Sequence, residues 1–384
     1  MRSTYHYKLI LFIWLICSSF LVANEVSKQW LDSKVKAITQ STPVKGMIYG
    51  LWIDNKAVDI NAVGLSMTKV KAKANMHFRI GGVTETMLTT LLMILDEQGK
   101  LKVEELVSEW YPNIPNANRI TLKMLANGTS GIPDYVYNTK FIKDVTKAPF
   151  RYFSSEDLLT YAFLDKKSSF PPGSSQHYSH SDYVVLGNII EKVMGQPLDI
   201  LFDQYIFHKL KMKNSKFTLT ASIYAPTLHS FSQDRPYSKD INQPVTDRIY
   251  EDSTFWSPSW TSSTGGVFST IQDLGIWAHA WMNSSLISTE STQELRAPDT
   301  VGKGKNTKSR YFAMGFGVLN HWLMQNPSFN GYSGIFAVLP KKKIVFIAFN
   351  TVKKDTDTDK TGNLSMKLWR EIAPKLAPEY PLPQ

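Results

Sequence analysis

Residues 78–100 read FRIGGVTETMLTTLLMILDEQGK, and this stretch decides the fold. Two adjacent glycines, at 81 and 82, predict a tight turn between a short strand and a helix. Thr84 can cap the start of that helix, and Gly99 can end it in a left-handed conformation. Because apolar residues fill most positions from 87 to 95, we expect the helix to be buried near the middle of the molecule.

A turn from a strand into a buried helix is a favourable place for a nucleophile, because the helix N-terminus stabilises developing negative charge. This turn contains neither Ser nor Cys. Gly82 could therefore be a turn glycine chosen for a positive φ angle. The one cysteine of the chain is Cys17, inside the N-terminal segment, which excludes a thiol enzyme.

Residues 1–23 have the pattern of a secretory signal peptide. Arg2 and Lys8 precede the apolar run 9–16, and Ser18, Ser19 and Ala23 supply small residues after it. We expect cleavage after Ala23, with an uncleaved membrane anchor as the alternative. The protein is thus predicted to be exported, either periplasmic or secreted, and an uncleaved segment would associate it with a membrane.

The chain is basic, with a formal net charge of +10 that falls to +8 if Arg2 and Lys8 leave with the signal peptide. A basic surface would favour contact with anionic lipid or a cell-wall polymer, although general solubility is the simpler interpretation. We find no arginine-rich run or nucleic-acid motif, so we expect no nucleic-acid partner. We also expect no cofactor.

Strand patterns at both ends of the chain enclose a helical middle. An amphipathic helix over 24–43 precedes a hairpin that turns at Asp54-Asn55, and a β-meander over 312–350 precedes a helix over 364–376. We therefore predict an α+β fold with one antiparallel sheet flanked by N- and C-terminal helices. Residues 24–384 would form one unit, with a helical region of roughly 100–260 inserted between the sheet halves.

Six segments resemble the serine β-lactamase and penicillin-binding-protein family, in its class C β-lactamase, D,D-peptidase and esterase branch. They occur in the family's order over roughly residues 30–375. The resemblance implies a β-lactamase/transpeptidase-like fold with a cleft between sheet and helical region. The segments are FRIGGVTETM…LDEQGKL, ITLKMLANGTSGIPDY, FPPGSSQHYSHSDYVVLGNIIEKVMGQPL, KLKMKNSKF, SPSWTSSTGGVFSTIQDL and GFGVLN…NGYSGIFAVLPKKKIVFIAFN.

Two motifs that carry the family's catalysis are altered here. Members use Ser-x-x-Lys at the start of the central helix, with Ser as nucleophile and Lys as part of its base. Here the Ser position is Gly82 and the Lys position is Glu85. The family's Tyr-x-Asn, which supplies a base and a polar contact, reads Tyr178-Ser179-His180, so that Tyr is kept and Asn has become His.

The third family motif, Lys- or His-x-Gly, binds the substrate carboxylate and helps form the oxyanion hole. The resemblance places it at Tyr332, Ser333 and Gly334, where the cation has become a phenol. The resemblance therefore implies a cleft whose scaffold is kept and whose reactive groups have changed.

Glu85 should need a partner, because a carboxylate in a partly buried cleft is costly when unpaired. We predict either a contact with His180 or a hydrogen bond with Tyr178. A role in favouring the helix dipole is the simpler interpretation of this residue.

Two functions from different classes follow. Loss of the nucleophile in triad-type enzymes removes about six orders of magnitude of rate. The first hypothesis is thus an inactive serine hydrolase that keeps its cleft for a peptide, a peptidoglycan fragment, an acyl ligand or a protein partner. The alternative is an esterase, peptidase or amidase with a changed mechanism around Glu85, Tyr178 and His180.

Other polar residues near the expected cleft have simpler interpretations. Thr84 or Thr86 could act as a displaced nucleophile, but their side chains should point away from the Ser direction. Ser130 and Ser333 are more often turn or backbone-binding residues than nucleophiles. His177 and His180 form His-x-x-His, but a loop does not ensure that both rings converge, so we expect no metal.

Overall fold

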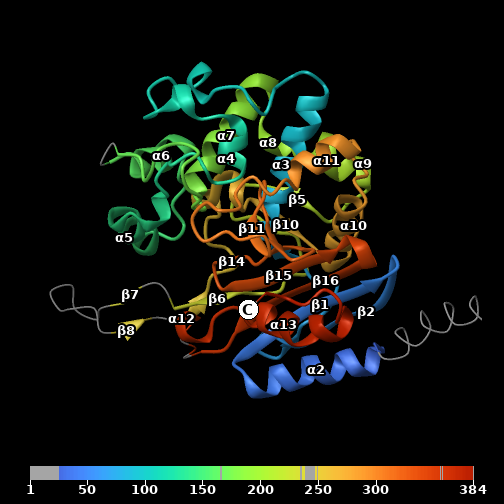
Figure 1. Cartoon of the computed structure of the whole chain (residues 1–384). Helices are drawn as coiled ribbons and strands as arrows, with labels where there is room; N and C mark the ends of the chain where they lie inside the picture. The colour runs from blue at the N-terminus through green and yellow to red at the C-terminus, as the bar shows by residue number, and fades with distance from the viewer. Residues whose placement is uncertain are drawn as a thin grey trace, which may run out of the picture.

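The computed structural model describes residues 26–164, 167–233, 236–237, 247–248, 250–354, 356 and 358–383. The predicted signal peptide and its cleavage point lie outside these residues. The chain folds into a large sheet with two helices on one face and a helical half beyond the other (Figure 1). Among the described helices, none combines the length and the apolar character that a membrane span requires.

The main sheet combines strands from both ends of the chain in the order β11-β12-β13-β15-β16-β1-β2-β3, with β14 paired to β15. Its pairs are antiparallel, and β1 lies beside β16 with Gly50 opposite Ile347. The strands are β1 Val44–Ile53, β2 Lys56–Met67, β3 Val70–Lys71, β11 Arg310–Phe312, β12 Gly317–Leu319, β13 Trp322–Gln325, β14 Ser328–Phe329, β15 Tyr332–Leu339 and β16 Ile344–Val352.

The alternation of side chains along these strands builds a core on each face of the sheet. On β1, Ile48 contributes to the core on the helical side, whereas Tyr49 and Leu51 contribute to the opposite core. The predicted hairpin turn is present at Asp54 and Asn55, which have φ angles of 50° and 63°.

Two terminal helices, α2 Lys28–Ser41 and α13 Leu364–Leu376, cover the outer face of the sheet, as the sequence predicted. Leu31 of α2 and Trp369 of α13 are both fully buried in the outer core. The Trp369 ring meets Trp322 of β13 edge to face, with ring centroids 5.6 Å apart. The first and last helices are thus fixed to the same face of one sheet.

The helical half lies between the sheet strands in sequence and beyond the inner face of the sheet in space (Figure 1). A small sheet of β4 Phe78–Arg79, β10 Val267–Ser269 and β5 Lys216–Phe217 joins it to the centre. Its helices are α3 Val83–Glu97, α4 Leu122–Ala126, α5 Thr139–Lys147, α6 Ser155–Ala162, α7 His180–Met194, α8 Leu198–Phe202, α9 His208–Leu210, α10 Ile271–Met282 and α11 Thr289–Leu295. The remaining short elements are β6 Phe231–Ser232, β7 Pro236–Tyr237, β8 Asp247–Arg248, β9 Glu251–Asp252 and α12 Thr358–Thr361.

Helix α3 is the buried helix that the opening stretch predicted, with every residue from 83 to 95 buried. Gly99, with φ at 66°, takes the predicted left-handed conformation after the helix. The predicted cap at Thr84 is wrong. The cap position is Gly82, which offers no side-chain hydrogen bond, and Thr84 lies inside the first turn with its buried hydroxyl unpaired among the described residues.

Candidate functional site

The two glycines in the turn before α3 have different backbone conformations. Gly81 has φ at +50°, the left-handed region in which a Cβ is unfavourable. Gly82 has φ at −59° and ψ at −8°, values that any residue adopts. The interpretation of Gly82 as a residue chosen for positive φ is therefore wrong, because Gly81 provides that conformation.

Gly82 faces a cluster of polar side chains. A Cβ built at this position would lie 3.0 Å from Oε1 of Gln325 and 3.5 Å from Oε1 of Glu85. The side chain of a serine at position 82 would therefore lie close to Gln325 and Glu85. Gly82 itself carries no oxygen, so the turn supplies the position of a nucleophile without the nucleophile.

Glu85, at the Lys position of the resemblance, is 0% exposed. Its Oε1 accepts a hydrogen bond from the Tyr178 hydroxyl, and its Oε2 accepts one from Nε2 of Gln325 at 3.1 Å. The same Gln325 nitrogen donates to the carbonyl of Gly315 at 2.7 Å. The hydrogen bond with Tyr178 is one of the two partners predicted for Glu85.

Burial raises the pKa of Glu85 well above its usual range, and this effect outweighs the hydrogen bonds from Tyr178 and Gln325, which lower it. Burial, together with the nearby Glu85 carboxyl, also raises the pKa of Tyr178 well above its usual range. Burial thus favours the protonated form of the carboxyl at the Lys position of the resemblance, which the Tyr178 hydroxyl and the Gln325 amide contact.

His180 turns to a different carboxylate from the one predicted. Its Nδ1 lies 3.0 Å from Oδ2 of Asp134, which is almost fully buried. The imidazole also meets the Tyr178 ring edge to face, with centroids 4.8 Å apart. The structure therefore brings Glu85, Tyr178 and His180 together, with His180 joined to Glu85 through the Tyr178 ring rather than by a direct hydrogen bond.

Sequence reasoning missed Asp134 and Gln325. Asp134 lies in the quoted segment ITLKMLANGTSGIPDY, but a turn-rich loop does not reveal which of its side chains points toward the cleft. Gln325 ends strand β13 and belongs to none of the quoted motifs. The one available signal was the requirement that a buried carboxylate find a donor, and this signal does not identify which donor.

The third motif lies at the start of β15, and Tyr332 is turned into the fold. Tyr332 is 2% exposed, and its hydroxyl donates to the carbonyl of Leu228 at 2.5 Å. This burial takes the phenol away from the surface that a ligand would contact, contrary to our expectation for Tyr332. Ser333 is half-buried, and a substrate contact by Ser333 or Gly334 remains a prediction.

The segment 325–329 lies across the gap between the nucleophile turn and β15. A Cβ on Gly81 would come within 2.9 Å of the Cβ of Pro327. On the other side, the Gly334 amide donates to the carbonyl of Pro327 at 2.9 Å. Phe329 continues the contact to Trp260, with ring centroids 5.5 Å apart. This segment, with Gln325 at its start, therefore covers one side of the site.

The other polar candidates have structural partners. The Ser130 hydroxyl donates to Asp182 at 2.5 Å and accepts from the Ile132 amide. Thr86 donates to the Val83 carbonyl. In the described part of the chain, no three His, Cys, Asp or Glu side chains converge in a way that could hold a metal ion.

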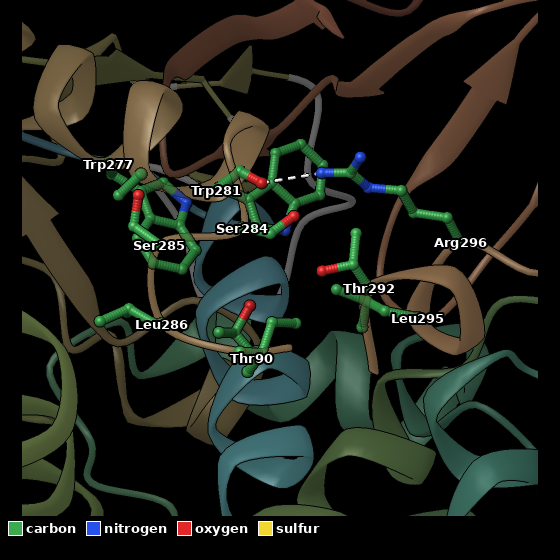
Figure 2. A pocket seen from close by; sticks show the side chains of 11 residues that line it. Thr90, Trp277, Trp281, Ser284, Ser285, Leu286, Thr292, Leu295 and Arg296 are labelled. Atoms are coloured by element: carbon green, nitrogen blue, oxygen red, sulfur yellow. Dashed lines mark hydrogen bonds between the residues drawn. The ribbon is translucent and has the colours of Figure 1, made fainter. Parts of the chain in front are cut away.

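A small pocket lies on another side of α3, between α10 and α11 (Figure 2). Thr90 lines it, at about 140° around the helix from Glu85. Arg296 closes one side by donating to the Trp281 carbonyl at 2.8 Å. The space open to water there is about 10 Å³, the room that one water molecule needs, so the pocket does not extend the site.

The family assignment rests on a match over most of the chain. The model of the Beta-lactamase family matches residues 31–367. The chain belongs to the Beta-lactamase family. Its fold is the β-lactamase/transpeptidase-like fold that the resemblance implied, with helices packed on an antiparallel sheet.

Similar proteins carry hydrolase names. An N-acetylmuramyl-L-alanine amidase of Bacillus subtilis is 25% identical over 60% of this chain and 55% of its own length. A putative penicillin-binding protein of the same species is 23% identical over 76% of this chain and 66% of its own. This chain thus spans about half to two thirds of these curated relatives.

A solved structure shows the fold alone, because its sequence identity is low. The D-amino acid amidase of Ochrobactrum anthropi SV3 superposes with a TM-score of 0.73 at 16% identity, covering 89% of this chain and 99% of the other. The likeness extends over nearly the whole amidase chain, so the sheet and the helical half are both shared.

Proposed function

We propose that this protein is an exported member of the family that does not act as a serine hydrolase and binds its ligand at the surface around Gly82, Tyr178 and His180. One observation carries the proposal. The nucleophile position holds no oxygen, and the base position holds a buried carboxyl, Glu85, whose pKa burial raises. Acyl transfer through serine requires an attacking oxygen and a group that accepts its proton.

The ligand that we propose is a peptide containing D-amino acids or a fragment of peptidoglycan. The relatives support this class, since their names refer to an amidase of N-acetylmuramyl-L-alanine, to penicillin binding and to D-amino acid amides. Tyr178, His180 and Trp260 have neighbouring rings that remain partly exposed and can contact such a ligand. Because burial favours the protonated form of Glu85, this residue would repel the carboxylate of a peptide less than an ionised glutamate would.

Covalent probes test the loss of activity. A fluorophosphonate and a fluorescent penicillin are incubated with the protein, and adducts are measured by intact mass. We expect none for the natural chain. The double variant Gly82→Ser with Glu85→Lys serves as the matched control, because the backbone at 82 accepts a side chain. A natural-chain adduct on any Ser or Thr would contradict the proposal.

Ligand binding is tested separately. Calorimetric titration with a muramyl pentapeptide ending in D-Ala-D-Ala is compared for the natural chain and for His180→Ala. We expect saturable binding that weakens in the variant. The all-L peptide of the same composition is the control. Equal heats for the D and L peptides would contradict the proposed ligand class.

A second function is favoured by the pair of His180 and Asp134. A carboxylate on Nδ1 leaves Nε2 as the nitrogen that accepts a proton, which is the arrangement that general bases use. In this alternative, Nε2 takes a proton from water, the water oxygen attacks an ester or amide carbonyl, and the proton passes to the leaving alcohol or amine.

Turnover of generic esters and D-amino acid amides distinguishes the two functions. Under the alternative, His180→Ala abolishes hydrolysis, and Asp134→Asn lowers it while changing the pH profile. Glu85→Gln should then leave most of the rate, because the raised pKa of Glu85 favours the protonated form, which Gln resembles. Turnover that equals the buffer blank for all substrates would eliminate this alternative.

A further inference from the structure

The outward surface of α5 and its flanking residues, 137–152, carries an unusual set of exposed side chains. Tyr137, Phe150 and Tyr152 are 77%, 68% and 58% exposed, more than any other large apolar side chain in the described part of the chain. Ile142 adds a fourth apolar group on the same stretch. Single exposed apolar residues need no explanation, but four within one short segment point to a partner.

The same surface is basic. Residues 137–152 contain Lys140, Lys143, Lys147 and Arg151 against one acid, Asp144. That acid is already engaged, since it lies 2.7 Å from the Lys140 ammonium and accepts from the Tyr161 hydroxyl. Arg151 has a loose pair, 3.8 Å from Asp157. Among the ion pairs of the described residues, none includes Lys143 or Lys147, so their charges face solvent.

The surface is held in a fixed shape. Phe141 points inward from α5 and packs on the rings of Tyr135, Phe153 and Tyr161. Its neighbour Ile142, with Lys143 and Lys147, therefore lies on the outward side of the same helix. The loop that follows is tied to the fold by the Ser257 amide, which donates to the carbonyl of Pro149 at 2.8 Å.

In the described part of the chain, α5 lies at the periphery of the fold (Figure 1). The helix lies at the outer edge of the helical half (Figure 1). Exposed aromatic side chains stand at both of its ends, and basic side chains lie between them. One short segment at the edge of the molecule therefore presents exposed aromatic and basic side chains together.

We propose that the 137–152 surface docks onto an anionic lipid bilayer. Tyr and other aromatic rings favour the headgroup level of a membrane, and Lys and Arg are attracted to acidic headgroups. A soluble polyanion would use the charges but leave Phe150 and Tyr152 in water. The combination of aromatic and basic side chains on one outward surface fits a bilayer, which takes up both. Docking of this kind would hold the proposed ligand-binding surface close to a membrane.

Spin labels locate the contact in the full chain. Cys17→Ser removes the one natural thiol, and Phe150→Cys or Ile200→Cys provides a single labelling position. Ile200, on α8, is the matched control because it is 48% exposed and lies outside the docking surface. Vesicles consist of phosphatidylcholine alone or of equal parts of phosphatidylcholine and phosphatidylglycerol. Collision rates with oxygen and with a water-soluble nickel complex are then measured.

We expect the label at 150 to gain collisions with oxygen and lose collisions with nickel on the phosphatidylglycerol vesicles only, while the label at 200 does not change. Equal changes at both positions, or none at 150, would overturn the proposal. The first of these results would show that another part of the chain, such as the N-terminal apolar segment, makes the contact.

Charge reversal tests the basic component. Lys143→Glu with Lys147→Glu should weaken partitioning onto the phosphatidylglycerol vesicles by about tenfold or more. Lys209→Glu with Lys213→Glu makes the same charge change at the same spacing elsewhere and should have a much smaller effect. Equal losses for the two pairs would overturn the proposal, since they would indicate attraction through net charge alone. A competition with soluble polyphosphate provides a further test. If polyphosphate binds tightly and removes the protein from vesicles while the label at 150 still collides with nickel, the proposal is overturned in favour of a polymer partner.

Discussion

At the residue scale, the protonation of Glu85 gives a stability change with a defined sign. The unfolded carboxyl ionises near 4.5, whereas burial keeps the folded carboxyl protonated to higher pH. Between these two pKa values the folded state binds one more proton, so the free energy of unfolding falls as pH rises, by about 1.4 kcal/mol per pH unit. Below 4.5 the contribution of the neutral carboxyl is fully present.

Glu85→Gln removes this titration and keeps the shape of the side chain. We expect the variant to match the natural chain near pH 4 within about 1 kcal/mol and to become relatively more stable as pH rises. Urea unfolding from pH 4 to pH 8 measures the difference. Glu97→Gln is the control of opposite sign. Burial raises the pKa of Glu97, but hydrogen bonds with Ser291 and Ser288 outweigh it and leave the pKa lowered. If the difference in unfolding free energy between Glu85→Gln and the natural chain does not vary with pH, the raised pKa of Glu85 is contradicted.

The sequence predicted part of this site for a physical reason. A carboxylate at the start of a buried helix had to find a partner, and Tyr178 is one of the two residues proposed for it. His180 was the other, and it pairs with Asp134 instead. Its partner could not be chosen from the sequence, because the loop at 133–135 and the start of α7 meet through tertiary contacts, among them the hydrogen bonds of Ser181 with the Pro133 carbonyl and the Tyr135 amide. Gln325 reaches Glu85 across a separation of 240 residues, which no local pattern records.

At the scale of elements, the turn before α3 distinguishes two neighbouring glycines. Gly81→Ala should destabilise the fold by about 1–3 kcal/mol, because a Cβ at φ +50° is strained and would meet Pro327 at 2.9 Å. Gly82→Ala should change stability by less than about 1 kcal/mol, since its backbone is helical and only the Gln325 side chain must move. The denaturant midpoints of the two variants measure these changes in stability. Equal losses of stability would show that the two glycines do not have the different roles described.

Secondary-structure elements were easier to predict from the sequence than the packing of one element against another. The apolar run after the two glycines was sufficient to identify α3 as buried, and Asp54-Asn55 was sufficient to identify a hairpin. The start of α3 was less certain, because Thr84 has the chemistry of a cap but lies two residues beyond the cap position, Gly82. The placement of segment 325–329 against Gly81 depends on strand pairing between β13, β14 and β15, which local propensity does not specify.

At the scale of the whole molecule, the sheet separates two cores. The inner core contains α3 and the site, and the outer core joins α2 and α13 to the other face. Alternate residues of β1 and β16 point into opposite cores, so the sheet separates the two cores and contributes side chains to both. The sequence indicated this arrangement only in outline, because an unbroken apolar run such as 344–349 indicates that both faces of a strand are buried without showing what covers each face.

This separation predicts how substitutions combine. Trp369→Ala should lower the free energy of unfolding by about 3–5 kcal/mol, because it removes a fully buried ring that packs on Trp322. Lys367→Ala, on the exposed side of the same helix, should change it by less than about 0.5 kcal/mol. Since Trp369 and Glu85 lie in different cores and share no partner, Trp369→Ala with Glu85→Gln should show the sum of the single effects within about 0.5 kcal/mol at any one pH. Urea unfolding at pH 7 of the natural chain, the two single variants and the double variant gives the coupling energy between the two substitutions. A coupling energy above about 0.5 kcal/mol would mean that the sheet transmits packing changes from the terminal helices to the site.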